Sequence, residues 1–259
     1  RRRLVSTDTA ARSAGDMSLI DHLRELRNRL LKSALAVLVG AVVGWIFYET
    51  IFDVLTLPYC DVVEAKGATC TLTSFDPLEP FGFRAQVAAY SGIFIALPVI
   101  FYQLWRFIAP GLYRKEKAYA ATFVAVSTLL FSAGAAVAYL TLPKALEFLL
   151  NVGGDGIENL TNVTKYTTLA LFTMAAFGVG FEFPIVLIAL QFVGLVEPAT
   201  LSRWRREAIV GITALAALIT PSVDPISMFA LAIPLYLFYE LSILAGKFIV
   251  RRREKALRS

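Results

Sequence analysis

Residues that build metal sites and nucleophilic catalytic sites are nearly missing from this sequence, which has a single His and two Cys among 259 residues. Zinc and the transition metals take most of their protein ligands from these residue types, so we expect no metal and no other cofactor. The one histidine, His22, lies outside every long apolar stretch, and no Gly-Lys-Ser/Thr motif that could bind a phosphate is present. These absences predict a protein that is not an enzyme.

Charged residues are also scarce. They make up 17% of the sequence, against 57% hydrophobic residues, and the mean hydropathy is +0.65. A soluble domain is usually about a quarter charged, and a globule of this size could not bury the extra apolar surface. The composition excludes an ordinary cytosolic enzyme and a disordered chain, and it predicts an integral membrane protein. In such a protein the net charge of +5 indicates topology rather than nucleic-acid binding.

Long stretches that are almost free of charge predict an all-α membrane protein with six transmembrane helices, because a helix crosses a bilayer core with about 20 apolar residues. The six stretches are Ser33–Tyr48, Ala85–Trp105, Ala118–Pro143, Tyr166–Val196, Ala208–Val223 and Pro225–Gly246. The fifth rises only about 24 Å, against a core of about 30 Å. We therefore expect a locally thinned bilayer beside it.

The Lys and Arg residues are distributed unevenly between the segments that join these stretches. They gather in both tails and in the segments 110–117 and 197–207, and few lie in the segments between. The positive-inside rule then places both termini in the cytoplasm. We divide the chain into a cytoplasmic N-terminal segment with an amphipathic helix (1–32), a six-span membrane domain (33–250) with an extracytoplasmic cap (49–83), and a basic cytoplasmic tail (251–259).

The expected cap contains both cysteines, Cys60 and Cys70. The extracytoplasmic compartment is oxidising, so we expect a disulfide between them. Closing a loop of this size stabilises the fold by up to about 3 kcal/mol. The alternative is a pair of free thiols.

Two carboxylates in the cytoplasmic segments are either structural or placed to bind a ligand. The segment 18–30 has the leucine spacing of an amphipathic helix, with Glu25 on its polar side and Arg29 four residues later, a spacing that favours an ion pair. Glu116 follows the helix break at Pro110-Gly111, at a helix start where an acidic residue stabilises the helix dipole. In the other interpretation, both are exposed carboxylates that receive a cationic ligand.

Two further carboxylates, Glu182 and Glu240, lie inside apolar stretches. A charge at that depth costs at least about 2.5 kcal/mol, so such a residue usually contacts a cavity or a partner. Pro184 cannot donate to the Gly180 carbonyl, which opens a polar gap beside Glu182. Glu240 lies nearer the cytoplasmic end, where its carboxylate can instead reach the headgroups.

At four places the chain resembles the TatC family, the polytopic core of the twin-arginine protein translocase. The matching motifs are His22–Leu30, Pro98–Tyr113 with Glu116, Phe177–Pro184, and Thr220-Pro-Ser with Asp224. The resemblance implies a concave, glove-like bundle of six spans in the bacterial cytoplasmic (inner) membrane, with both termini in the cytoplasm. It also implies a receptor for twin-arginine signal peptides that serves as the core subunit for the export of folded proteins. The implied partners are single-span Tat proteins of the TatA and TatB type, membrane lipid, and other copies of the chain, and the implied energy source is the proton-motive force.

The resemblance also carries residue roles to matching positions. For signal-peptide binding these are Glu25, Glu116, Phe107 and Gln103; for intramembrane polar or partner contacts, Glu182; for the extracytoplasmic cap, Pro58 and Asp224. To these we add Arg27 at the signal-peptide site and Glu240 among the intramembrane contacts. Two carboxylates on a basic face suit two adjacent arginines, because a guanidinium pairs with a carboxylate through two hydrogen bonds. The cysteine pair is not a family feature that the resemblance supplies.

Two other function classes remain open from the residues alone. In a proton-coupled transporter of small molecules, Glu182 and Glu240 would carry protons, and Glu25 and Glu116 would be structural. A membrane scaffold would bind no ligand at all. The position of the functional carboxylates separates a receptor from a transporter, since a receptor needs them at the cytoplasmic face and a transporter needs them at the midplane.

Overall fold

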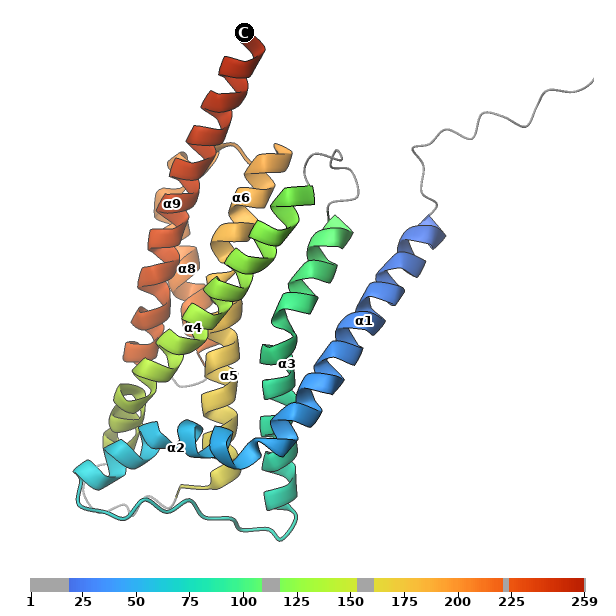
Figure 1. Ribbon diagram of the computed structural model, residues 1–259. Helices are drawn as coiled ribbons and strands as arrows, with labels where there is room; N and C mark the ends of the chain where they lie inside the picture. Colours follow the sequence, from blue (N-terminus) through green and yellow to red (C-terminus); the bar gives the residue numbers. More distant parts are fainter. Residues whose placement is uncertain (1–18, 109–116, 153–160, 221–223, 259) are drawn as a thin grey trace, which may run out of the picture.

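The computed structural model describes residues 19–108, 117–152, 161–220 and 224–258, and nearly all of them are helical (Figure 1). The all-α prediction is therefore confirmed. The helices in these ranges are α1 (Leu19–Ile46), α2 (Tyr48–Ala65), α3 (Glu79–Ile108), α4 (Lys117–Val152), α5 (Val163–Phe181), α6 (Phe183–Val193), α7 (Pro198–Arg203), α8 (Arg205–Ile219) and α9 (Pro225–Arg258).

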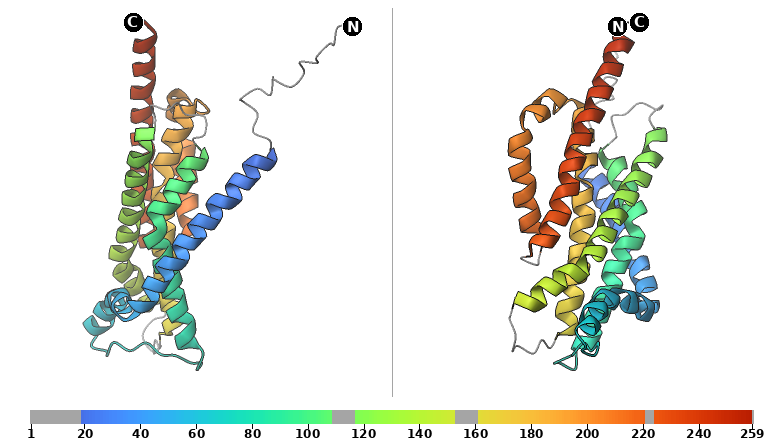
Figure 2. Two further views of the ribbon diagram at one scale, coloured as in Figure 1. Left: turned by 45° about the vertical axis from the view of Figure 1, so that its right-hand side comes forward. Right: turned by 90° about the vertical axis from the view of Figure 1, so that its left-hand side faces the viewer.

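Five segments in the described part of the chain are long and apolar enough to cross a membrane. They are His22–Ile46, Glu79–Phe107, Ala121–Val152, Val163–Gln191 and Pro225–Phe248. The sixth expected span corresponds to α8, which has only 15 residues and rises about 22 Å. Figure 2 shows that the neighbouring ends of α8 and α9 stop short of the level that α2 occupies. The sequence therefore predicted the position of α8 correctly, but α8 is too short to count as a spanning helix by length.

The expected boundaries at 32/33 and 250/251 fall inside helices. α1 runs from Leu19 to Ile46 and α9 from Pro225 to Arg258, each without a break. The amphipathic N-terminal segment is thus the first part of the same helix as the first span. Neither expected boundary therefore coincides with the end of a helix.

Glycines allow a close helix crossing between α1 and α3. A Cβ atom added at Gly92 would lie 2.6 Å from both the Ala41 nitrogen and the Val37 oxygen, and one added at Gly40 would lie 2.8 Å from the Gly92 oxygen. The two backbones meet without room for a side chain. Lipid tails are as apolar as leucine, so helices in a membrane gain stability from this kind of close packing.

We expect a Gly92→Ala variant to lose thermal stability in detergent. Overpacking of a filled site costs about 1–3 kcal/mol, which exceeds the gain of about 0.5–1 kcal/mol from replacing a glycine in a helix. Gly211→Ala is the matched control, because nothing lies within 4 Å of a Cβ at this position in α8. That variant should be as stable as the parent or more stable. Equal melting temperatures for the two variants would contradict the packing argument.

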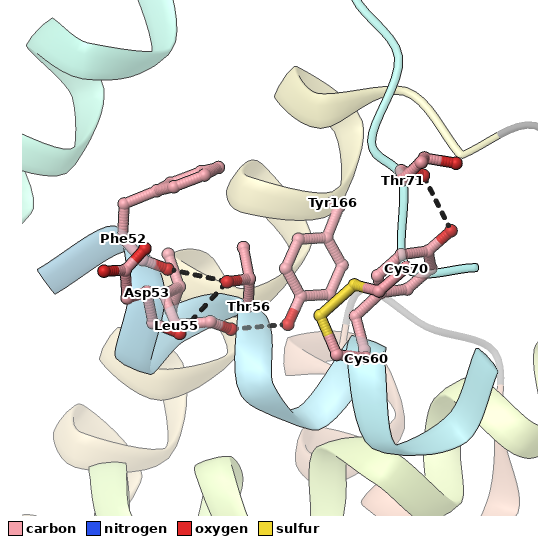
Figure 3. The surroundings of a disulfide bond; sticks show 9 residues. Phe52, Asp53, Leu55, Thr56, Cys60, Cys70, Thr71 and Tyr166 are labelled. Carbon is pink, nitrogen blue, oxygen red and sulfur yellow. Dashed lines mark hydrogen bonds between the residues drawn. A yellow bond between two sulfur atoms is a disulfide. The ribbon is translucent and has the colours of Figure 1, made fainter. Parts of the chain in front are cut away.

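The α2 helix lies across the ends of the longer helices and forms the expected cap (Figure 1). Its buried face, which includes Leu55 and Tyr59, joins a cluster with Leu142 and Leu146 of α4 and Tyr166 of α5. The Tyr166 hydroxyl donates to the Leu55 carbonyl at 2.6 Å (Figure 3). The cap is thus packed onto the bundle and also hydrogen-bonded to it.

A disulfide joins Cys60 of α2 to Cys70 in the extended segment that follows, as the sequence predicts (Figure 3). Beyond it, Thr73 pairs with the start of α5: its backbone nitrogen donates to the Thr161 carbonyl, and Val163 donates to the Thr73 carbonyl, both at 3.0 Å. The disulfide therefore fixes one end of an extended segment whose other end is held by backbone hydrogen bonds.

We expect the double variant Cys60→Ser/Cys70→Ser to unfold at a lower temperature than the parent, with a loss of up to about 3 kcal/mol. Because the backbone hydrogen bonds at Thr73 remain, the rest of the bundle should keep its helical content. Circular dichroism with and without reductant measures both effects. Thiol labelling of both cysteines in non-reduced parent protein would show that the bond does not form.

Candidate functional site

The Glu25 side chain is paired within its own helix. Arg29, one turn later on α1, donates from Nε to Glu25 Oε1 at 3.1 Å, and its Nη2 donates to the same oxygen. The pair is partly enclosed, since 12% of the Arg29 side chain and 28% of the Glu25 side chain are exposed. The ion pair that the spacing predicts is therefore present.

The start of α1 lies against the end of α3. The rings of His22 and Phe107 stack with their centroids 4.6 Å apart and their planes at 23°. Charges from both helices act on the Glu25 carboxylate, namely Arg29 and His22 from α1 and Arg106 from α3. The structure thus brings together residues of the first two motifs, since His22 and Phe107 are 85 positions apart in the sequence.

The remaining residues expected at this site fall into three groups. Gln103 lies half-buried on α3, one turn before Phe107. Arg27 is exposed and two residues from Glu25, so it lies on the opposite side of α1 from the carboxylate. Glu116 lies outside the described residues. The described site therefore contains one of the two expected carboxylates, on which Arg106 of α3 acts, and one turn before it the His22 ring that stacks on Phe107.

Glu182 lies where the fourth expected span changes from α5 to α6. Pro184 lies in the first turn of α6, and the helix is interrupted at Glu182, between the end of α5 and the start of α6. One carboxylate oxygen, Oε1, is buried without a hydrogen-bond partner, as is the hydroxyl of the fully buried Ser127 of α4. The two side chains are close enough to interact, although no hydrogen bond of normal geometry joins them. The break therefore places a carboxyl group against a second polar group inside the bundle.

Glu240 is in a different situation, because its charge is already paired within the chain. Arg205 at the start of α8 donates to Glu240 Oε2 at 2.8 Å, and the Tyr236 hydroxyl donates to Oε1 at 3.2 Å. The side chain is 28% exposed. Of the two carboxylates inside apolar stretches, only Glu182 has a buried oxygen without a hydrogen-bond partner.

Pro58 helps to dock the cap. Its ring nitrogen cannot donate to the Val54 carbonyl one turn earlier, and the Tyr139 hydroxyl of α4 donates to that carbonyl instead, at 2.7 Å. Asp224 has a different role, because its Oδ1 accepts from the Ser227 nitrogen at 2.6 Å and so caps α9. Figure 1 shows the start of α9 away from α2, so these two residues act in separate places.

Two features of this arrangement left no signal in the sequence. The His22–Phe107 stack and the Tyr139–Val54 hydrogen bond join distant segments, and no local spacing indicates either contact. Within the described ranges, no three His, Cys, Asp or Glu side chains are grouped so that they could hold a metal ion.

The sequence matches a known protein family over most of its length. The family described as "Sec-independent protein translocase protein (TatC)" matches residues 21–234. A protein named Sec-independent protein translocase protein TatC from Frankia casuarinae is 39% identical over 257 residues, which cover 95% of this chain and 71% of that protein. The protein of the same name from Aquifex aeolicus is 38% identical and is matched over 92% of this chain and 98% of its own length.

A solved structure supports the same relationship. A structure described as the crystal structure of the twin-arginine translocase receptor TatC is 38% identical to this chain and matches it with a TM-score of 0.72. The match covers 88% of this chain and 98% of the solved chain. Together with the five apolar segments, these matches show that the chain is a multi-pass membrane protein that belongs to the TatC family of Sec-independent protein translocase proteins.

Proposed function

We propose that this chain is the receptor for twin-arginine signal peptides and the core subunit of a translocase that exports folded proteins. The observation that carries the proposal is the position of Glu25 in a chain of the TatC family: it lies within the electrostatic reach of Arg106 of α3, one turn after the His22 ring that stacks on Phe107. It acts as a binding protein and not as an enzyme. The proton-motive force supplies the energy for transport.

In the proposed complex, Glu25 and Glu116 each accept one guanidinium of the peptide. A guanidinium is a planar fork of donors that matches a carboxylate, whereas the ammonium of a lysine is a single point of charge. Arg106, which acts on Glu25 from α3, and Arg27, on the other side of α1, give this end of the protein a positive charge that repels cationic peptides that do not reach the two carboxylates. Gln103 and Phe107 supply the polar and aromatic wall on the α3 side.

A binding measurement tests this function. Full-length protein in detergent should retain a peptide that carries two adjacent arginines, and it should retain the same peptide with two lysines much less. A chain that binds neither peptide, or both equally, would contradict the receptor function. Transport of a small molecule in the absence of peptide would instead support a proton-coupled transporter, the alternative that the buried Glu182 favours.

For the topology, we infer six crossings with both termini in the cytoplasm of a bacterial inner-membrane protein. α8 then serves as a short sixth crossing, and the bilayer thins beside it. The helices form a concave bundle along which the apolar part of a signal peptide lies. Single-span Tat partners contact the Glu182 region, and lipid and further copies of the chain complete the surroundings.

A reporter enzyme that is active only outside the cytoplasm measures this topology. Fused after Ser259 it should be silent, and fused near Gly154 it should be active. Both results follow from the basic residues that gather in the tails and in the segments 110–117 and 197–207. Activity at the C-terminal fusion would require an odd number of crossings and would contradict the proposed topology.

A further inference from the structure

The proposed binding carboxylate is not open in the structure, because a residue of the same helix already binds it. Two nitrogens of the Arg29 guanidinium donate to Glu25 Oε1. In the described part of the chain, no hydrogen bond involves the second oxygen, Oε2. Arg29 therefore makes the kind of contact that an arginine of a signal peptide is proposed to make.

The geometry makes this internal contact persistent. Both residues lie on the continuous helix α1, one turn apart, with the acidic residue first, which is the favourable order. The Arg29 side chain is the more enclosed of the two, at 12% exposure. A fully exposed pair contributes little because water and salt screen it. A partly enclosed pair is screened less and keeps its carboxylate occupied for a larger fraction of the time.

We propose that Arg29 is an internal competitor for Glu25, and that its guanidinium must leave Oε1 before a signal-peptide arginine binds there with full geometry. This inference rests on the proposed receptor function, and it adds a minimum affinity that a peptide needs in order to be bound. The open oxygen gives the exchange a starting point, since an incoming guanidinium approaches Oε2 while Arg29 still holds Oε1. The carboxylate is then never left without a partner in a partly enclosed place, which would be costly.

A competitor within the receptor has a definite thermodynamic signature. The apparent dissociation constant of any ligand that needs the free carboxylate is raised by the inverse of the fraction of receptor in which Glu25 is free. That factor belongs to the receptor and not to the ligand. Arg29 therefore weakens twin-arginine and twin-lysine peptides equally, and it leaves the ratio of their affinities unchanged. Because Arg29 raises every apparent dissociation constant by the same factor, peptides of low affinity are no longer bound, whereas peptides of high affinity still are.

The test is Arg29→Gln in the full-length chain, with fluorescence anisotropy of labelled twin-arginine and twin-lysine peptides. For a pair of this strength we expect both peptides to bind about three- to six-fold more tightly than to the parent. The ratio of the two dissociation constants should stay the same. Weaker or unchanged binding of the twin-arginine peptide would overturn the proposal, and so would a change confined to one peptide.

Three further variants separate competition from a general effect of charge. Lys32→Gln removes the same charge one turn further along α1, where the side chain is exposed, and should change both affinities much less. Arg29→Lys keeps the charge but loses the two-nitrogen contact, so it should tighten binding by an intermediate factor even if Arg29→Gln folds poorly. In a Glu25→Gln background, Arg29→Gln should have no further effect. An equal effect of Lys32→Gln, or an undiminished effect without Glu25, would overturn the proposal.

The two proposals fail in different ways. If the parent chain does not prefer the twin-arginine peptide, the receptor function is wrong whatever Arg29 does. If the parent shows the preference and Arg29→Gln does not tighten binding, only the competition is wrong.

Discussion

A Glu25→Ala variant is expected to bind a twin-arginine signal peptide about 10- to 150-fold more weakly than the parent, which corresponds to about 1.5–3 kcal/mol for a hydrogen bond to a charged group. Glu116→Ala should lose a similar amount, and the double variant should lose less than the sum if both residues contact the same arginine pair. Isothermal calorimetry or anisotropy with the full-length chain in detergent measures all three.

The control for this prediction is a carboxylate that also forms an ion pair within its own helix but lies outside the site. Glu147 pairs with Lys144 on α4, also within one helix, and both side chains are at least half exposed. Glu147→Ala should leave peptide binding unchanged. The melting temperatures should fall little for Glu25→Ala, because the pair that it breaks lies at the end of α1 rather than in a buried cluster. Unchanged affinity in the Glu25/Glu116 double variant would leave the receptor without its proposed site.

The periodic features of the chain were predictable from its sequence, because a membrane imposes simple rules on length and charge. The apolar stretches predicted α1, α3, α4, α8 and α9, and the interrupted pair α5 and α6, at nearly the right residues. The Glu25–Arg29 pair follows from helical spacing alone. The disulfide follows from two cysteines in one segment that the charge pattern predicts to be extracytoplasmic.

The contacts that assemble the site were not predictable in the same way. The stack of His22 on Phe107 depends on how α1 crosses α3, and that crossing is set by the missing side chain at Gly92. A glycine in an apolar stretch gives no indication of which helix will approach it. The ion pair of Glu240 with Arg205 has the same origin, since it depends on α8 packing beside α9.

Replacing Glu182 with Ala is expected to reduce transport about ten-fold, the factor that corresponds to about 1.4 kcal/mol, which lies within the usual range for one hydrogen bond. The reason is the polar pair that the break between α5 and α6 creates. The Ser127 hydroxyl is buried and has no hydrogen-bond partner in the described structure, and without the carboxyl group it also loses the neighbouring polar group that could become its partner. Ser127→Ala should therefore reduce transport in the same direction. Ser132→Ala is the matched control, since that exposed hydroxyl bonds to the Thr128 carbonyl of its own helix.

The Glu182→Gln variant decides how the carboxyl group works. If Glu182 acts by hydrogen bonding to Ser127 or to a partner helix, the amide of Gln can both donate and accept, so transport should stay near that of the parent. If Glu182 transfers protons, Gln should be as damaging as Ala, because an amide does not titrate. We expect the hydrogen-bonding result, since the side chain that acts on Glu182 in the described structure is a serine, which is itself no proton carrier at neutral pH. Export of a folded cargo by Gln, Ala and parent chains at equal membrane levels measures the difference. Full activity of the Ala variant would show that transport needs neither role.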